Sequence, residues 1–468
     1  MPILAAFAVP HPPLIIPAVG RGRERGIQAT IDAYDEVGRR IAALAPDTVV
    51  VSSPHATMYR DYFQISPGRS ARGSFAQFGA PQAAYEARYD TELVAELCRV
   101  CERDGIEAGT DYERDPRLDH GTMIPLHFIE KYYTGFELVR IGLSGFSPAE
   151  HYRLGRAVQE AARTLGRRVV YVASGDLAHK LAEDGPYGFA PEGPVFDERI
   201  AQDFAAGDLL DVLCMDHSLA ERAAECGLRS FQMMAGALDR TAVTAELLSH
   251  EGPFGVGYGV AAFTPTGEEG ADETRALLPQ YEAWRTADLA TRKAGEDQYV
   301  QLARASLETY VREGRRIAPD DAGLEVPSEL FTTRAGCFVS LKVDGQLRGC
   351  IGTIAPTQRS LAQEICANAI SAGTRDPRFS AVRASELADL VYDVDVLTEA
   401  EPTTRADLDP ARYGVIVSCA DGRRGLLLPD LDGVDTVDEQ LRIAAQKGHI
   451  DLDFDDYRLE RFEVVRHV

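Results

Sequence analysis

Three histidines follow short apolar runs in the first 180 residues of the chain. The runs and their histidines are residues 3–9 with His11, residues 48–51 with His55, and residues 169–173 with His179. Runs of this length, bounded by Pro, Gly and Ser, are typical of buried strands in a parallel sheet. Because ligands of open α/β sheets collect outside the carboxyl ends of the strands, we expect the three imidazoles to converge. Imidazole is a common metal ligand, so this arrangement predicts a metal site.

A carboxylate in a later segment can complete such a site. Glu225 lies just before the apolar, helix-like run 231–238. At this junction it is either a charge at the N-terminus of a helix or the third ligand of a hard metal. Two histidines and one carboxylate form the facial triad of non-heme Fe(II) oxygenases, which leaves positions for substrate and dioxygen. The predicted ligands are therefore His11, His55 and Glu225.

The remaining histidines of the predicted site are candidates for proton transfer. His179 follows the third apolar run, and His120 precedes the helix-like run 123–132. Imidazole acts as general acid or base near neutral pH, so both are predicted catalytic residues. The alternative for His120 is a position at the start of a helix, with capping by Asp119 or Thr122.

The elements that must position these residues form an α/β domain followed by a smaller α+β domain. From the start to about residue 265, strand-like and helix-like stretches alternate, which predicts a mainly parallel sheet flanked by helices over 1–265. Its last strand is expected at 254–263, where glycines alternate with larger residues and allow close packing. The segment 266–272 is typical of a linker. The second domain is predicted at 296–468, and its Asp344-Gly345 dipeptide indicates a β-hairpin.

Composition excludes several classes of protein. The net charge of −24 argues against nucleic-acid binding, which depends on clustered Lys and Arg. No stretch of eighteen apolar residues and no signal peptide is present, so no membrane span is expected. Eight cysteines in 468 residues are too few for a disulfide scaffold, which indicates a cytoplasmic protein. Cys98 and Cys101 form a CxxC pair inside a helix-like stretch, where packing is the alternative to a zinc or redox role.

Five motifs in the first domain resemble a known family. They are Val-Pro-His-Pro-Pro at 9–13, Ser-Pro-His at 53–55, Asp-His-Gly at 119–121, Ser-Gly-Asp-Leu-Ala-His at 174–179 and Glu-Cys-Gly-Leu-Arg-Ser at 225–230. Together they resemble the class III (LigB-like) extradiol ring-cleavage dioxygenases and their Memo relatives. The resemblance implies an Fe(II) enzyme that opens a catecholic ring next to its paired hydroxyls with O2. It matches His11, His55 and Glu225 to the iron ligands.

The same resemblance matches His179 to the catalytic base and His120 to a second active-site histidine. One feature departs from proven dioxygenases, because Glu225 is followed by Cys226 and Gly227, as in Memo proteins. In those relatives histidines and a cysteine surround the metal, so Cys226 or His179 can replace Glu225 as the third ligand. The residues do not distinguish Fe(II) from Zn(II) or Mn(II).

Motifs at 347–352, 375–379 and 425–429 in the second domain resemble the AMMECR-type domain. Within them, Cys350 is a candidate nucleophile, with Arg348 as the neighbour that would lower its pKa, and a packed thiol is the alternative. Arg375 and Arg378 either grip an anionic ligand or pair with Asp376 and other acids.

The two halves joined in one chain resemble the AmmeMemoRadiSam system, in which a radical S-adenosylmethionine enzyme is associated. The alternative function is therefore a metal-binding accessory component with such a partner. A homo-oligomer is compatible with the sequence, which leaves the ring substrate open.

Overall fold

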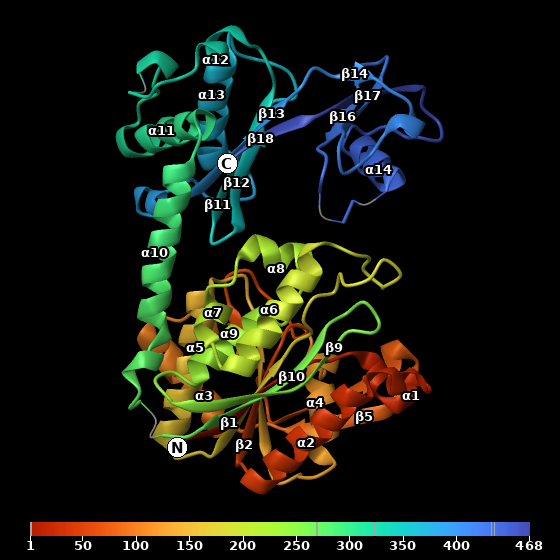
Figure 1. Cartoon of the computed structure of the whole chain (residues 1–468), viewed down its shortest axis with the longest axis vertical. Helices are drawn as coiled ribbons and strands as arrows, with labels where there is room; N and C mark the ends of the chain where they lie inside the picture. Colours follow the sequence, from red (N-terminus) through yellow and green to blue (C-terminus); the bar gives the residue numbers. More distant parts are fainter. Residues whose placement is uncertain (1, 268–269, 322, 432, 435) are drawn as a thin grey trace. The chain divides into compact units, whose positions relative to one another are not determined.

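The computed structural model describes residues 2–267, 270–321, 323–431, 433–434 and 436–468 (Figure 1). Contacts divide the chain into two compact units that meet between Arg285 and Thr286. The predicted linker at 266–272 includes residues 268–269, which lie outside the described residues. The sequence did not predict helix α10 (Leu277–Gly295), in which the division falls. Leu277 and Tyr281 of this helix pack in the core of the first unit, which therefore extends beyond residue 265.

The first unit contains a six-stranded mixed sheet, mostly parallel, which confirms the predicted α/β class. In spatial order the strands are β7 (Glu137–Gly142), β2 (Thr48–Ser53), β8 (Val169–Ser174), β1 (Ile3–Val9), β10 (Tyr258–Pro265) and β9 (Val243–Glu251). The first four pair in parallel, whereas β10 is antiparallel to both of its neighbours. Because β2, β8 and β1 are adjacent, the three apolar runs that precede histidines end side by side.

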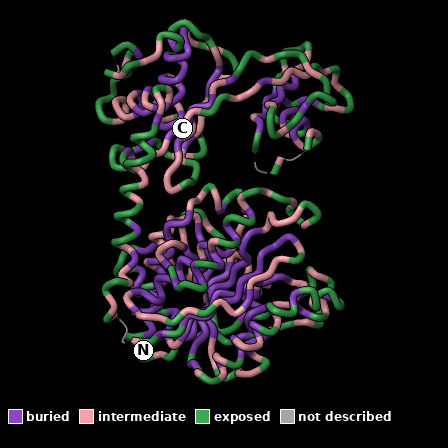
Figure 2. The backbone as a smooth tube through the Cα atoms, viewed as in Figure 1, coloured by how far each residue is buried: buried purple, intermediate pink, exposed green. Residues whose placement is uncertain are grey.

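Helices cover both faces of this sheet, which is why the central strands β2 and β8 are buried at every position. Ala6 and Ala8 of β1 belong to one core cluster and Phe7 to the other, as expected when successive side chains point to opposite faces. Figure 2 shows these strands as the most deeply buried part of the unit. The helices are α1 (Pro17–Gly20), α2 (Gln28–Leu44), α3 (Thr91–Asp104), α4 (His120–Glu130), α5 (Pro148–Leu165), α6 (Glu192–Ala206), α7 (Leu209–Leu213), α8 (His217–Ala223) and α9 (Leu228–Ala237). The short strands β3 (Phe63–Gln64) with β6 (Ala108–Gly109), and β4 (Ser70–Phe75) with β5 (Ala80–Arg88), form two small sheets.

The strand expected at 254–263 begins later, at Tyr258, because residues 254–257 form a turn. The expected close approach of the glycines does occur. A side chain at Gly257 would meet the Asp197 carboxylate, and Gly257 instead exchanges main-chain hydrogen bonds with Leu177 and Ala178 at 2.9 and 2.7 Å. The glycine turn therefore anchors the segment that leads to His179.

The second unit is α+β, as predicted. Its first sheet has the order β12 (Gln346–Gly352), β11 (Cys337–Val343), β13 (Val391–Leu397) and β18 (Val464–His467), and its second has β14 (Glu401–Pro402), β17 (Tyr457–Phe462), β15 (Gly414–Cys419) and β16 (Arg424–Leu427). The helices are α11 (Gln298–Glu313), α12 (Ser328–Thr332), α13 (Leu361–Thr374) and α14 (Val437–Lys447). The hairpin between β11 and β12 turns at Asp344 and Gly345, whose φ angles of 48° and 75° explain the residues found there.

The state of the cysteines and the apolar character of the helices relate to the expectations about disulfide bonds and membrane spans. All eight cysteines are free thiols. Cys98 and Cys101 lie in α3, where burial raises the pKa of Cys101 to about 12, as expected of a packed thiol. Among the described residues, no helix combines the length and the apolar character that a membrane span requires.

Candidate metal centre

The ends of β1 and β2, the two strands that flank β8, bring two of the predicted ligands into contact. His11 follows β1 and His55 follows β2, and their Nε2 atoms lie 2.9 Å apart. The Sγ atom of Cys226, in the turn before α9, lies 3.5 Å from His11 Nε2. His11 is buried, whereas His55 is exposed. The three side chains thus form a set of nitrogen and sulfur donors that solvent reaches from the side of His55.

Two groups of donor atoms lie within 4.8 Å of one another in the described part of the chain. One consists of His11, His55 and Cys226, and the other of Asp176, His179 and Cys226. Cys226 belongs to both, so the groups are neighbours. Imidazole and thiolate ligands suit iron, zinc and copper, whereas hard ions prefer oxygen. The donor set therefore fits a transition metal.

The hydrogen bonds of His11 define which of its nitrogens is free to bind a metal. The Ser174 hydroxyl donates its only proton to the Gly121 carbonyl at 2.6 Å, so it must accept from His11 Nδ1, 3.0 Å away. The proton of neutral His11 is therefore on Nδ1, and the lone pair of Nε2 points toward His55 and Cys226. Asp176 Oδ1 also accepts a hydrogen bond from the His11 main-chain nitrogen at 2.6 Å. A metal-binding histidine commonly has this kind of support for its other nitrogen.

Glu225, the predicted third ligand, lies at the start of α9. Its Oε2 accepts a hydrogen bond from the Leu228 main-chain nitrogen at 2.6 Å, and Glu225 belongs to neither donor group. This hydrogen bond is consistent with the helix-terminus alternative that the sequence left open, and the role of Glu225 as third ligand stays a prediction. The neighbouring residue, Cys226, lies beside His11 instead.

His120 lies beside the two histidines and also begins a helix. Its ring centroid is 3.9 Å from that of His55 and 5.5 Å from that of His11. It is the first residue of α4, and Asp119 caps this helix by accepting a hydrogen bond from the Thr122 main chain at 3.0 Å. The position of His120 is thus compatible with both interpretations from the sequence, a catalytic residue and a residue at the start of a helix.

His179 lies on a segment fixed at several points. Its main-chain nitrogen donates to Ala223 at 2.9 Å, and the preceding Ala178 donates to Asp197 Oδ1 at 3.1 Å. The ring stacks on Tyr187 with 4.9 Å between centroids. Its Nε2 is buried without a hydrogen-bond partner among the described residues, and lies 4.0 Å from Asp176 Oδ2. A buried nitrogen without a partner is costly, which indicates that a bound group completes its environment.

Burial and the clustering of the histidines determine their charge. Burial, with repulsion from His55, lowers the pKa values of His120 and His179 to about 4. The histidines are therefore neutral at pH 7, as metal ligands and general bases must be. Burial and the nearby Asp176 raise the pKa of the Cys226 thiol. A bound cation reverses that preference, because it stabilises the thiolate.

Comparison with known proteins identifies the families of the two domains. Residues 5–261 match the family described as the catalytic LigB subunit of aromatic ring-opening dioxygenase. The chain belongs to the LigB family. Residues 300–467 match the AMMECR1 family, so the LigB domain is fused to an AMMECR1 domain.

Proteins similar to this LigB-family chain come from bacteria and archaea. A Clostridium acetobutylicum protein is 41% identical over 470 residues, 98% of each chain. A Thermotoga maritima protein is 54% identical over 175 residues, which cover 37% of this chain and 98% of that one. A crystal structure of an uncharacterized protein from Pyrococcus horikoshii is 30% identical, covers 36% of this chain and 88% of its own, and gives a TM-score of 0.33.

In the AMMECR1 domain, the candidate residues Arg348, Cys350 and Arg378 each contact a polar side chain. Arg378 pairs with Asp376 at 2.7 Å, which is the ion-pair alternative. Arg348 pairs with Glu386 at 2.8 Å, so a carboxylate partly offsets its charge. The Cys350 thiol accepts a hydrogen bond from the Ser340 hydroxyl at 3.2 Å, and a neutral hydroxyl is a poor base. These contacts favour a structural role for the motifs over a nucleophilic cysteine.

Sequence reasoning missed Asp176 and Arg140 as functional candidates. Asp176 lies in the same motif as His179, and burial raises its pKa to about 7. Arg140 lies within an apolar strand, β7, and is 2% exposed. A charged residue inside an apolar strand was the available signal, because a buried guanidinium requires partners.

Proposed function

We propose that the LigB domain is a metal-dependent oxygenase that opens a catechol-like ring next to its paired hydroxyl groups. The observation that carries this proposal is the contact of His11 with both His55 and Cys226, beside the unpartnered Nε2 of His179, in a domain of this family. The substrate class follows from the family, which acts on small aromatic molecules. Fe(II) is the proposed metal, and when bound it would supply open coordination positions and the redox chemistry that dioxygen requires.

His11, His55 and Cys226 are the proposed ligands. The tautomer of His11 leaves Nε2 unprotonated, and both other donor atoms are within 3.5 Å of it. The Glu225 carboxylate already accepts a hydrogen bond from Leu228, the first residue of α9. A thiolate in place of a carboxylate also suits Zn(II) better than Mn(II), because thiolates favour softer metals.

His179 is the proposed general base for a substrate hydroxyl. It is neutral, held by main-chain hydrogen bonds, and its Nε2 has no competing partner. The negative charge of a catecholate would raise the pKa of His179 and hold the proton once transferred. Asp176, 4.0 Å away, would stabilise the resulting imidazolium. His120 lies beside His55, and we propose that it acts as a second proton donor or acceptor.

Oxygen consumption tests the proposal directly. Protein purified without oxygen and loaded with Fe(II) is expected to consume O2 in proportion to the loss of catechol, protocatechuate or gallate, with a yellow ring-opened product. Oxygen uptake by an oxygen electrode and product absorbance provide the two measurements. A fully iron-loaded chain that leaves all three catechols unchanged would contradict the oxygenase.

The second candidate is an accessory metal-binding component, which the presence of Cys226 in the donor set favours. Cysteine and histidine ligands are what the resemblance to Memo proteins implies, and the fused AMMECR1 domain accords with it. This function predicts that a radical S-adenosylmethionine enzyme copurifies with the metal-loaded chain. Inactivity toward catechols together with that copurification would support the accessory function.

Variants of two adjacent residues distinguish the third ligand. Cys226→Ala is expected to weaken metal binding by more than about 100-fold, because it removes a direct ligand and not an outer partner. Glu225→Gln is expected to retain the metal and to lower stability by only about 0.3–1 kcal/mol, the usual value of a charge at a helix N-terminus. Metal titration and thermal unfolding measure the two effects. The opposite pattern, with metal lost in Glu225→Gln alone, would restore the facial triad.

A further inference from the structure

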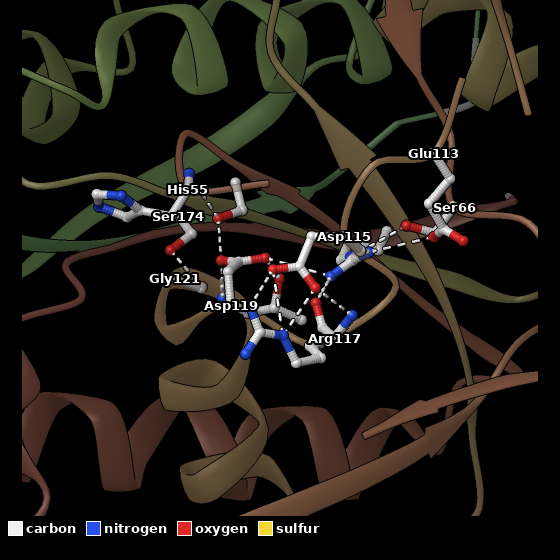
Figure 3. A network of polar contacts seen from close by, with 11 residues as sticks. His55, Ser66, Glu113, Asp115, Arg117, Asp119, Gly121 and Ser174 are labelled. Atoms are coloured by element: carbon white, nitrogen blue, oxygen red, sulfur yellow. Dashed lines mark hydrogen bonds and ion pairs between the residues drawn. The ribbon is translucent and has the colours of Figure 1, made fainter. Parts of the chain in front are cut away.

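The buried Arg140 lies at the centre of a network of polar and charged groups outside the proposed ligand set. Its guanidinium contacts a hydroxyl, two main-chain carbonyls and two carboxylates. These groups belong to Ser66 at 2.6 Å, Arg117, Asp115 at 3.4 Å, and Glu113 and Asp119 at 3.6 Å each (Figure 3). Burying a guanidinium is costly, so a side chain with 2% exposure is tolerated only with partners of this kind.

Asp119 carries the network from Arg140 to the ligand segments. Its Oδ1 accepts hydrogen bonds from Ser53 Oγ at 2.6 Å and from the Thr122 main chain at 3.0 Å. Ser53 Oγ in turn accepts a hydrogen bond from the His55 main-chain nitrogen at 3.2 Å. One carboxylate therefore holds both the turn that carries His55 and the start of the helix that carries His120.

The packing at this point leaves little freedom for either segment. A side chain at Gly121 would lie 2.4 Å from Ser53 Oγ, so α4 approaches the end of β2 as closely as glycine permits. The Gly121 carbonyl also accepts the hydrogen bond from Ser174 that defines the tautomer of His11. The contacts that support His11 and those that support His55 thus meet at Gly121, two residues after Asp119 in the chain.

We infer that Arg140 is a positioning residue of the metal centre, which acts through Asp119 and Ser53 to fix the His55 main chain. The inference rests on the proposed ligand set of His11, His55 and Cys226. Residues that orient ligands raise affinity because the ligands lose less freedom when the metal binds. Metal affinity should therefore depend on Arg140 although no atom of it reaches the donors.

Ser53→Ala tests the link with the smallest structural change. It removes the hydroxyl that joins Asp119 to His55, and the Arg140–Asp119 pair remains. The dissociation constant for Co(II), measured by titration of the metal-free full chain, is expected to rise by about 10- to 100-fold, the usual effect of an outer-sphere partner. The absorption bands of bound Co(II) should also change, because they report the geometry of the ligands. Ser306→Ala is the matched control, since Ser306 is equally buried but donates to Cys366 in the AMMECR1 domain.

Two further variants test whether Co(II) affinity depends on the charged groups of the network. Asp119→Asn keeps a helix-capping side chain but removes the charge that pairs with Arg140. Arg140→Lys keeps a positive charge but loses the planar fork that reaches several partners at once. Both are expected to weaken Co(II) binding, and Asp119→Asn serves alone if Arg140→Lys does not fold.

The outcomes separate this inference from the proposed ligand set. Co(II) binding and spectra that are unchanged in Ser53→Ala and Asp119→Asn, in a wild-type chain that binds Co(II), would contradict the positioning role alone. A wild-type chain that binds no Co(II) would overturn the proposed metal site and this inference with it. Weaker binding with altered bands, absent in Ser306→Ala, would support the inference.

Discussion

Replacement of both His11 and His55 by alanine is expected to abolish metal binding. The two Nε2 atoms are 2.9 Å apart and provide two of the three proposed ligands, so the double variant retains only the thiol of Cys226. Burial raises the pKa of that thiol, so without the two histidines it is a weak metal ligand. Metal analysis of protein purified without oxygen should find a stoichiometric amount in the wild type and only background in the variant.

A matched control separates loss of the site from loss of the fold. His127→Ala combined with His217→Ala removes two histidines of the same domain that lie outside both donor groups. This control should retain the metal, and thermal unfolding of both metal-free double variants should show a cooperative transition. Full metal occupancy in the His11 and His55 double variant would reject the proposed site.

Replacement of His179 by alanine is expected to lower turnover by about 10² to 10⁴, the usual contribution of general acid–base catalysis. The metal should stay near wild-type occupancy, because the proposed ligands are on other segments. Ala223 holds the main chain of His179 and Asp197 that of Ala178, so the ring stays where a base is required and no other group replaces it easily. Metal content and oxygen uptake must both be measured on the same preparation of this variant.

The two measurements distinguish the roles open to His179. Loss of metal together with activity would make it a ligand, as the second donor group with Asp176 and Cys226 allows. Retained metal with unchanged turnover would reject both roles. Tyr187→Phe is a useful companion variant, because it keeps the ring that stacks on His179 and should leave metal and turnover close to wild type.

The sequence by itself determined the sheet and the convergence of histidines upon it. The apolar runs before His11, His55 and His179 are strands because they are buried on both faces, and this leaves a signal in composition alone. Likewise, Asp344-Gly345 determined a hairpin, since few residues adopt positive φ at both central positions of its turn. Such features depend on local chain properties, which the order of residues specifies directly.

Only the tertiary structure decided which residue faces the histidines. Glu225 and Cys226 are adjacent in a turn, where no regular period relates residue number to side-chain direction. Gly175 and Gly227 approach so closely that a side chain at Gly175 would lie 2.1 Å from the Gly227 Cα atom, and this contact places Cys226 beside Asp176. Arg140 likewise acquires its partners from a loop distant in sequence. These contacts join segments that the sheet brings together only after folding, so residue spacing could not reveal them.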